Sequence, residues 1–213
     1  MQIIKPSVEL VNPVPYKQML NTVELAIRNC YQSYDKMKDG SDEAIIKGCI
    51  ARGHSSPLEF GNIAVHLITD RAVMAQLTRH RVASYAIMSQ RYVNYSKDKF
   101  GNSIDFIEPE GLSNEAYDNW VGACRVAEAA YMVMTKDLGT PAEVARSVLP
   151  NCTATSIYAS ANIREWRHIF ELRCDSHSQR DIRSLMKATL KLMYEQYPVF
   201  FGDLYEKFCT NEG

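Results

Sequence analysis

Apolar residues follow two different spacings along this chain. Apolar positions three or four residues apart indicate helices, whereas alternation with β-branched residues indicates strands. The helical spacing extends over residues 16–29, 41–52, 71–77, 113–138, 144–149, 162–173 and 178–194. The alternating pattern extends over residues 3–11, 62–69, 105–107 and 153–158. This mixture predicts an α+β fold in which long helices accompany a small mixed or antiparallel sheet.

Residues that typically begin helices support this reading. Thr140, Pro141 and Glu143 combine a capping hydroxyl, a proline at the first helical position and a glutamate at the third. Ser178, followed three residues later by Asp181, is a second predicted helix start. Both signals lie directly before segments with helical apolar spacing, so they predict where those helices begin.

The densest chemical feature follows the predicted helix that Asp70 can cap. Residues 76–91 contain three arginines, one histidine and two serines, without a single Asp or Glu. Guanidinium groups donate in a fork that fits phosphate or carboxylate oxygens, so a cluster without acids predicts an anion site. The helix is expected to run into this cluster, where Gln76, Arg79 and His80 would share a face and reach one ligand.

Length and composition fit one domain over residues 1–213. The chain is 46% hydrophobic and 23% charged, enough for one large core. Lys and Arg number 24 and Asp and Glu 25, a net charge of -1, so the basic excess of a general nucleic-acid binder is missing. The positive charge is local, and no nucleic-acid partner is expected. Arg167, Arg180 and Arg183 are predicted to lie on solvated helix faces.

The apolar runs and the cysteines indicate the cellular compartment to expect. No apolar run approaches the roughly 20 residues of a spanning helix, and residues 1–5 are unlike a signal peptide, so we expect a cytoplasmic protein without a membrane partner. The six cysteines form no Cys-x-x-Cys pair, which favours free thiols. Cys174 and His177 have the spacing of metal ligands, but no second pair accompanies them, so no metal is expected.

Four segments, in order along the chain, carry a resemblance to a known family. Arg79-His80-Arg81, followed after seven residues by Ser89, is similar to its signature, with Gln76 at the place of its preceding glutamine. The other segments are Gly53-His54-Ser55-Ser56-Pro57-Leu58-Glu59, then Glu143-Val144-Ala145-Arg146-Ser147-Val148-Leu149-Pro150, then Asn162-Ile163-Arg164 with Leu172-Arg173-Cys174-Asp175-Ser176-His177-Ser178-Gln179. Together they resemble the flavin-dependent thymidylate synthases; Arg-His-Arg alone would be weak evidence.

The resemblance implies a flavin-dependent thymidylate synthase-like fold and a homotetramer with active sites at subunit interfaces and FAD bound across subunits. It implies reductive methylation of dUMP to dTMP, with methylenetetrahydrofolate as carbon donor and NADPH as the reductant of FAD. By analogy with the family, the FAD contacts would be Ser56, Arg79, His80, Arg81, Asn162, Arg164 and His168. The residues that would bind the pyrimidine nucleotide are Gln76, Arg79, Ser89, Gln90, Arg91, Arg146 and Arg173.

Arg173 resembles the activating residue of the family and is the predicted catalytic residue. A fixed cation beside the N3/O2 edge of a pyrimidine stabilises negative charge there and makes C5 more nucleophilic, without covalent attack by the enzyme. A methylase that uses a cysteine nucleophile would instead need Cys152. Its neighbours Thr153, Ala154 and Thr155 indicate a core strand without an activating base, so a buried, unreactive thiol is favoured.

The chain departs from the usual family pattern at two places. Ala86, Ile87 and Met88 are apolar where relatives carry a polar and an acidic residue, and His168 stands where an amide is usual in some relatives. Loss of a carboxylate changes the local charge, so a divergent relative that alkylates C5 of another pyrimidine nucleotide, with a methyl or hydroxymethyl group, is one alternative. A non-catalytic flavin- or nucleotide-binding protein is another, although the presence of Arg173 argues against it.

Overall fold

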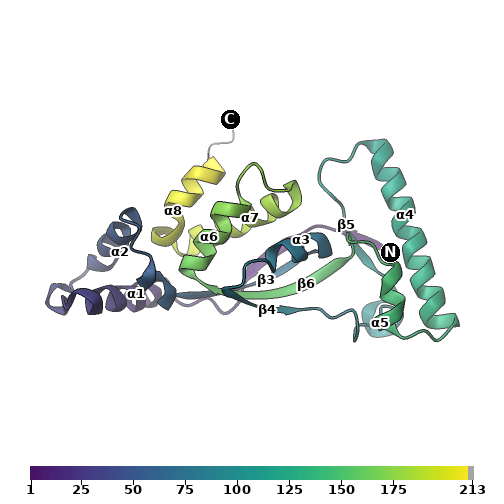
Figure 1. The fold of residues 1–213 in the computed structure, drawn as a ribbon, viewed down its shortest axis with the longest axis horizontal. Helices are drawn as coiled ribbons and strands as arrows, with labels where there is room; N and C mark the ends of the chain where they lie inside the picture. Colours follow the sequence, from purple (N-terminus) through teal and green to yellow (C-terminus); the bar gives the residue numbers. More distant parts are fainter. Residues whose placement is uncertain (211–213) are drawn as a thin grey trace. The chain divides into compact units, whose positions relative to one another are not determined.

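The computed structural model describes residues 1–210, which form helices and short strands in alternation (Figure 1). The helices are α1 (Tyr16–Tyr31), α2 (Ser41–Ala51), α3 (Arg71–Leu77), α4 (Asn114–Met132), α5 (Ala142–Ala145), α6 (Ile163–Arg173), α7 (Arg180–Gln196) and α8 (Pro198–Tyr205). The strands are β1 (Gln2–Ile4), β2 (Ser7–Leu10), β3 (Asn62–Asp70), β4 (Ala83–Ile87), β5 (Asp105–Ile107) and β6 (Ala154–Asn162). The predicted α+β class, with small sheets and long helices, is confirmed.

The strands form two sheets. One has four strands in the order β2-β3-β6-β4, and the other pairs β1 with β5 in parallel, with Ile3 beside Phe106. In β3, the alternate residues Ile63, Val65 and Leu67 are buried, which is the period expected of a strand with one face in the core. The apolar alternation that predicts this strand in the sequence therefore corresponds to its buried face.

The chain forms two compact units. Unit 1 comprises residues 1–7, 67–79 and 86–157, and unit 2 comprises residues 8–66, 80–85 and the described residues from 158 onward. Strands β3, β4 and β6 contribute residues to both units. One domain over residues 1–213 stays a prediction, and the two units are described separately below.

In unit 2, helices α6, α7 and α8 pack against one another around aromatic side chains (Figure 1). The ring of Phe170 lies between those of Trp166 and Phe201, with centroids 5.8 Å apart in each pair. The Trp166 indole Nε1 also donates a hydrogen bond of 3.0 Å to the carbonyl oxygen of Ile63 in β3. These contacts fix one face of α6 in the core and leave its other face to carry polar side chains.

The start of α6 is fixed by a glycine. The backbone N–H of Ile163 donates to the carbonyl oxygen of Gly61 at 2.8 Å. A Cβ atom at Gly61 would overlap Cδ1 of Ile163 and would lie 2.8 Å from Sδ of Met19. Only a glycine permits this close approach, which brings α6 beside the short 3₁₀ helix at Ser56–Phe60.

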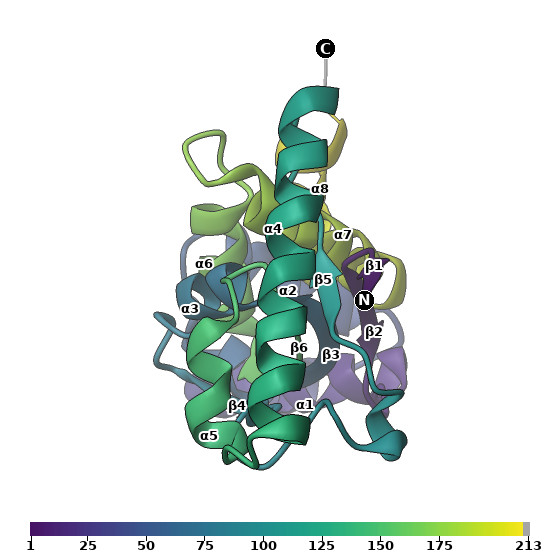
Figure 2. The ribbon, with the colours of Figure 1, turned by 90° about the vertical axis from the view of Figure 1, so that its right-hand side faces the viewer.

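Unit 1 has a separate core between α4 and β5. Buried side chains include Tyr95, Phe106, Cys124 and Tyr131, and the backbone N–H of Tyr95 donates to the Tyr131 hydroxyl at 3.3 Å. Figure 2 shows α4 running past β5, with α5 at its side. Most of α4 faces away from this core, since Cys124 and Tyr131 are its buried residues.

The structure corrects the predicted end of the helix before the arginine cluster. Helix α3 ends at Leu77: the backbone N–H and the hydroxyl of Thr78 both donate to the Met74 carbonyl at 3.0 Å, and the N–H of Arg79 donates to the Gln76 carbonyl at 3.3 Å in a closing turn. Arg79 and His80 therefore follow the helix, Arg79 exposed and His80 buried. The expectation that Gln76, Arg79 and His80 share one helical face is wrong.

Other boundaries differ by a few residues. Residues 3–11 form two strands because Lys5 and Pro6 interrupt them, and β4 and α8 were not predicted. Helix α7 begins at Arg180, since the Ser178 hydroxyl donates to the Leu172 carbonyl at 2.8 Å instead of capping the helix. Within residues 1–210, no helix has both the length and the apolar composition needed to cross a membrane.

Candidate functional site

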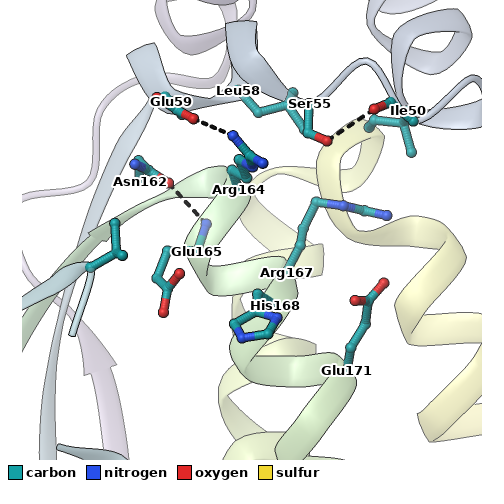
Figure 3. Close-up of a pocket in the computed structure, with 12 residues that line it drawn as sticks. Ile50, Ser55, Leu58, Glu59, Asn162, Arg164, Glu165, Arg167, His168 and Glu171 are labelled. Atoms are coloured by element: carbon teal, nitrogen blue, oxygen red, sulfur yellow. Dashed lines mark hydrogen bonds and ion pairs between the residues drawn. The ribbon is translucent and has the colours of Figure 1, made fainter. Parts of the chain in front are cut away.

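Unit 2 contains a cavity of about 610 Å³ beside α6 (Figure 3). Its walls come from the end of α2, the 3₁₀ helix at Ser56–Phe60, Val82 and the polar face of α6. Of the predicted FAD contacts, Asn162, Arg164 and His168 line this cavity. One face of α6 is buried through Trp166. The opposite face borders the cavity and carries these side chains.

Local sequence explains how α6 presents these groups. Asn162 precedes the helix and its Oδ1 accepts a hydrogen bond of 2.8 Å from the backbone N–H of Glu165, which makes it the N-cap. Arg164 and His168 follow at a spacing of four, one helical turn apart, so they share a face of α6. Asn162 thus shapes the start of the helix while its amide also borders the cavity.

The arginines of the cavity are already engaged by carboxylates. Arg164 Nη1 lies 2.5 Å from Glu59 Oε1, an ion pair between two half-exposed side chains (Figure 3). Arg167 binds both oxygens of Asp203, at 2.7 and 2.6 Å, and its side chain is only 13% exposed. The prediction of a solvated face for Arg167 is wrong, since this bidentate pair fixes it beside the cavity.

The other predicted FAD residues lie elsewhere. Ser56 opens the 3₁₀ helix and Arg81 follows His80; both are exposed, and neither is among the described side chains that line the cavity. Arg79 belongs to unit 1, where its Nε donates to the Ala75 carbonyl at 3.2 Å. The structure therefore brings together only part of the predicted set within unit 2.

His80 is the buried member of the Arg-His-Arg sequence, with 5% of its surface exposed. Arg173 Nε donates a hydrogen bond of 3.0 Å to His80 Nε2, and the ring of His168 meets the His80 ring edge-on at 5.8 Å. Burial, with the nearby charge of Arg173, lowers the pKa of His80 to about 4. His80 is therefore neutral near pH 7, as the hydrogen bond from Arg173 requires.

Glu165 was missed by the sequence analysis. It is 9% exposed, lines the cavity, and places its Oε1 3.7 Å from Nδ1 of His80. The stretch around His80 contains no acid in the sequence, but the fold brings the carboxylate of Glu165 close to His80. Its place three residues after the capping Asn162, typical of a capping box, was the signal available in the sequence.

In unit 1, two predicted substrate residues contact Glu143, Arg91 at its carboxylate and Arg146 at its backbone carbonyl. Arg91 Nε lies 3.4 Å from Glu143 Oε2, and Arg146 Nε donates to the Glu143 carbonyl oxygen at 3.1 Å. The Ser89 hydroxyl accepts a hydrogen bond of 3.3 Å from the backbone N–H of Arg91. The structure therefore brings together Ser89, Arg91 and Arg146, from two segments separated in sequence.

The remaining predicted substrate residues have different surroundings. Gln76 is half-buried on α3, whereas Gln90 is 5% exposed and its Nε2 has no hydrogen-bond partner among the described residues. Arg173 belongs to unit 2, at the end of α6. The buried amide of Gln90 lies beside the buried hydroxyl of Tyr95, in the core of unit 1.

The thiol of Cys152 lies next to another thiol. Its Sγ is 3.6 Å from that of Cys124, and burial raises the pKa of Cys124 to about 12. The thiolate is the nucleophilic form, and a second buried thiol is not an activating base. The surroundings of Cys152 agree with its predicted role as an unreactive core residue.

These elements and their order define the class of protein. The chain belongs to the family of thymidylate synthase complementing proteins, Thy1, whose family model matches residues 12–199. It is similar to the flavin-dependent thymidylate synthase of Geobacter sulfurreducens, with 34% identity over 189 residues that cover 85% of this chain and 80% of the relative. The corresponding enzyme of Mycobacterium avium is 32% identical over 200 residues, which cover 85% of this chain and 78% of the relative.

The fold has solved counterparts. The UMP/dUMP methylase PolB from Streptomyces cacaoi, bound with 5-Br dUMP, superposes with a TM-score of 0.80, 24% identity and 98% coverage of each chain. The same methylase bound with 5-Br UMP gives a TM-score of 0.79, 23% identity and coverage of 97% of this chain and 96% of that one. The predicted family and its fold are confirmed.

Proposed function

We propose that this protein is a flavin-dependent thymidylate synthase that methylates dUMP to dTMP, with methylenetetrahydrofolate as carbon donor and NADPH as reductant. The observation that carries the proposal is Arg173, held through Nε by the neutral ring of His80. A cation fixed in this way is suited to stabilise charge on a pyrimidine. Membership of the Thy1 family supports the same activity.

The donors around the unit 2 cavity fit FAD. The cavity of about 610 Å³ has arginine, amide, serine and histidine groups on its walls beside the carboxylates of Glu59, Glu165 and Glu171. It offers hydrogen-bond donors to ring carbonyls, and to a pyrophosphate if Arg164 exchanges its half-exposed partner Glu59 for it. Asn162, Arg164 and His168 would hold the cofactor there, and the proposal assigns Ser56, Arg79, His80 and Arg81 to it as well. When bound, the flavin would supply the hydride that reduces the transferred carbon.

Exposed groups in unit 1 fit the nucleotide phosphate. Arg91 pairs with the Glu143 carboxylate, Arg146 donates to the Glu143 backbone carbonyl, and the Ser89 hydroxyl lies beside the Arg91 backbone. A phosphate that takes the place of the Glu143 carboxylate would accept from Arg91 Nε with a higher negative charge, and the Arg146 guanidinium would supply further donors beside it. Gln76, Arg79 and Gln90 complete the proposed nucleotide set.

Arg173 would act on the base itself. Its guanidinium would face the N3/O2 edge of the pyrimidine, favour the ionised base and so make C5 the nucleophile. No proton or bond on a cysteine is needed in this scheme, in agreement with the buried thiol that neighbours Cys152. The enzyme residues would therefore bind, orient and stabilise charge rather than attack the substrate.

A second candidate is methylation of a ribonucleotide or another pyrimidine nucleotide. Ala86 and Ile87 belong to strand β4 and carry no group that hydrogen-bonds a sugar hydroxyl or a base. The solved methylase of the same fold is named for both UMP and dUMP. Transfer of a hydroxymethyl group, or flavin binding without turnover, are the remaining alternatives.

The proposal includes a cytoplasmic homotetramer with active sites at subunit interfaces, as in the family resemblance. Sedimentation of the purified protein tests the assembly directly. A mass four times that of the 213-residue chain is expected, and a monomer that retains full turnover would overturn this part of the proposal.

Flavin loading and a nucleotide panel test the activity. We expect purified protein to be yellow, or to become so on incubation with FAD and removal of the unbound cofactor. With methylenetetrahydrofolate and NADPH, dUMP should be turned over faster than UMP, CMP or dCMP. Protein that cannot be loaded with FAD would contradict the proposal, and turnover of UMP alone would favour the second candidate.

A further inference from the structure

We propose that Glu165 is a positioning residue for Arg173 and acts through His80, by holding the ring in the tautomer that accepts a hydrogen bond from Arg173. The inference rests on the proposed function where it assigns Arg173 to the pyrimidine. Its structural part concerns three side chains of unit 2 and stands without a substrate.

The first step is the direction of the hydrogen bond between Arg173 and His80. The guanidinium can only donate, so His80 Nε2, 3.0 Å from Arg173 Nε, must be unprotonated. A neutral imidazole with a free Nε2 lone pair carries its proton on Nδ1. The contact with Arg173 therefore requires one of the two neutral tautomers of His80.

A nearby carboxylate favours that tautomer. The carboxylate of Glu165 places Oε1 3.7 Å from Nδ1 of His80, on the side of the ring opposite to Arg173. This separation exceeds a hydrogen bond, so the effect is electrostatic attraction of the Nδ1–H dipole. Glu165 is 9% exposed and His80 5%, and such attraction is stronger away from water.

The third step concerns the other groups that face His80. The His168 ring lies edge-on at 5.8 Å, and the Tyr85 hydroxyl donates to the His80 carbonyl oxygen at 3.1 Å. Burial and the nearby Glu165 raise the pKa of Tyr85 to about 12, so it stays a neutral phenol. Among these groups, Glu165 is the anion that can bias the ring proton toward Nδ1.

The consequence is an oriented guanidinium. Arg173 donates through Nε, the nitrogen nearest its own chain, so this hydrogen bond constrains the plane of the guanidinium. If the proton moved to Nε2, that nitrogen would face Arg173 Nε–H with a second donor, and the hydrogen bond would be lost. In this inference, Glu165 acts on Arg173 through the His80 ring.

The tautomer is tested on the whole protein, labelled with ¹⁵N in histidine and assigned with the His80→Gln variant. We expect the ¹⁵N shifts of wild-type His80 to report Nδ1–H and an unprotonated Nε2 from pH 6 to pH 8. Glu165→Gln should move these shifts toward the Nε2–H form. The matched control is Glu195→Gln, an exposed carboxylate of α7, which should leave them unchanged.

Kinetics on the same variants test the positioning. At saturating FAD, we expect Glu165→Gln to lower kcat about 10-fold, since small misplacements of a catalytic group cost rate, with the nucleotide KM within about twofold of wild type. Glu165→Asp, which keeps the charge, should recover part of the loss, and Glu195→Gln should match wild type.

The outcomes separate this inference from the proposed function. Unchanged His80 shifts in Glu165→Gln, or wild-type kcat in that variant, would overturn the role of Glu165. Wild-type protein that methylates no pyrimidine nucleotide would instead refute the proposed function, while the shift of the His80 tautomer in Glu165→Gln would still support the structural inference.

Discussion

In unit 2, the guanidinium of Arg173 donates to the buried ring of His80, whereas in unit 1 Arg91 pairs with the half-exposed carboxylate of Glu143. The Arg91–Glu143 pair has about half of each side chain in water, at 55% and 53%. Exposed pairs of this kind contribute about 0–1 kcal/mol, so Arg91 can exchange Glu143 for a phosphate at little cost. Arg173 contrasts with it, because a buried neutral histidine sets its direction.

The comparison indicates different roles for the cations of the two units. Under the proposed function, Arg173, which would act on a specific atom of the base, is held by a buried partner in unit 2, and Arg91, which would bind the doubly charged phosphate, is exposed in unit 1. Loss of an oriented group should therefore reduce kcat, and loss of an exposed cation should raise KM.

The largest effect is expected for Arg173→Ala. Removal of a preorganised charge at the reacting base typically costs about 100- to 1000-fold in kcat, and we expect at least that loss while FAD stays bound. Single-turnover kinetics and the flavin absorbance of the same sample measure both. Arg180→Ala, an exposed arginine of α7, is the control, and loss of flavin colour in Arg173→Ala would show that this residue holds the cofactor.

The next effect is expected in unit 1. Arg91→Ala and Arg146→Ala should each raise the KM for the nucleotide about 10- to 100-fold, because charge-assisted hydrogen bonds contribute about 1.5–3 kcal/mol. Their kcat values should change much less. Steady-state kinetics measure both constants, with Arg125→Ala on the exposed side of α4 as control. A large fall in kcat with unchanged KM would erase the distinction between the units.

The pH dependence of stability should carry the signature of His80. The pKa of His80 is about 4 when folded and about 6.5 when unfolded, so the unfolded state binds more protons between these values. The stabilisation is complete above pH 6.5 and is lost as the pH falls toward 4, by an amount on the order of 2 kcal/mol. Urea unfolding at pH 7 and pH 4.5 measures it. His80→Gln should show a smaller difference, and an equal one would contradict the buried neutral ring.

The last prediction concerns the change in stability when one glycine from each unit is replaced by alanine. Gly61→Ala in unit 2 would overlap Ile163 and should destabilise the protein by about 1–3 kcal/mol. Gly122→Ala on α4 in unit 1 meets no atom within 4 Å and should stabilise it by up to about 1 kcal/mol. Thermal unfolding measures both. Equal changes would indicate that the approach of Gly61 to α6 is not tight.

The sequence predicted the features that depend on local residue spacing. It predicted the helix that forms α6, because helical period is a local property. It missed the contact of Glu165 with His80, since these residues are brought together only by the packing of α6 in unit 2. It also missed that Ala86 and Ile87 form strand β4, because the partner of a strand is not visible in the strand itself.

The carboxylate partners of the arginines could not be predicted from the sequence either. The stretch from Gln76 to Arg91 has no acid in sequence, yet Glu143 faces Arg91 and Glu165 faces His80 in the folded protein. Residue type predicted that an anion would be bound, and only the structure gives which cations are held in place and which are exposed.

The central claim is tested most directly by the mass of the nucleotide formed from dUMP by FAD-loaded protein with methylenetetrahydrofolate and NADPH. We expect dTMP from the wild type, and from Arg173→Ala only unreacted dUMP in the presence of bound flavin. Unreacted dUMP with wild-type protein that is fully loaded with FAD would contradict the account.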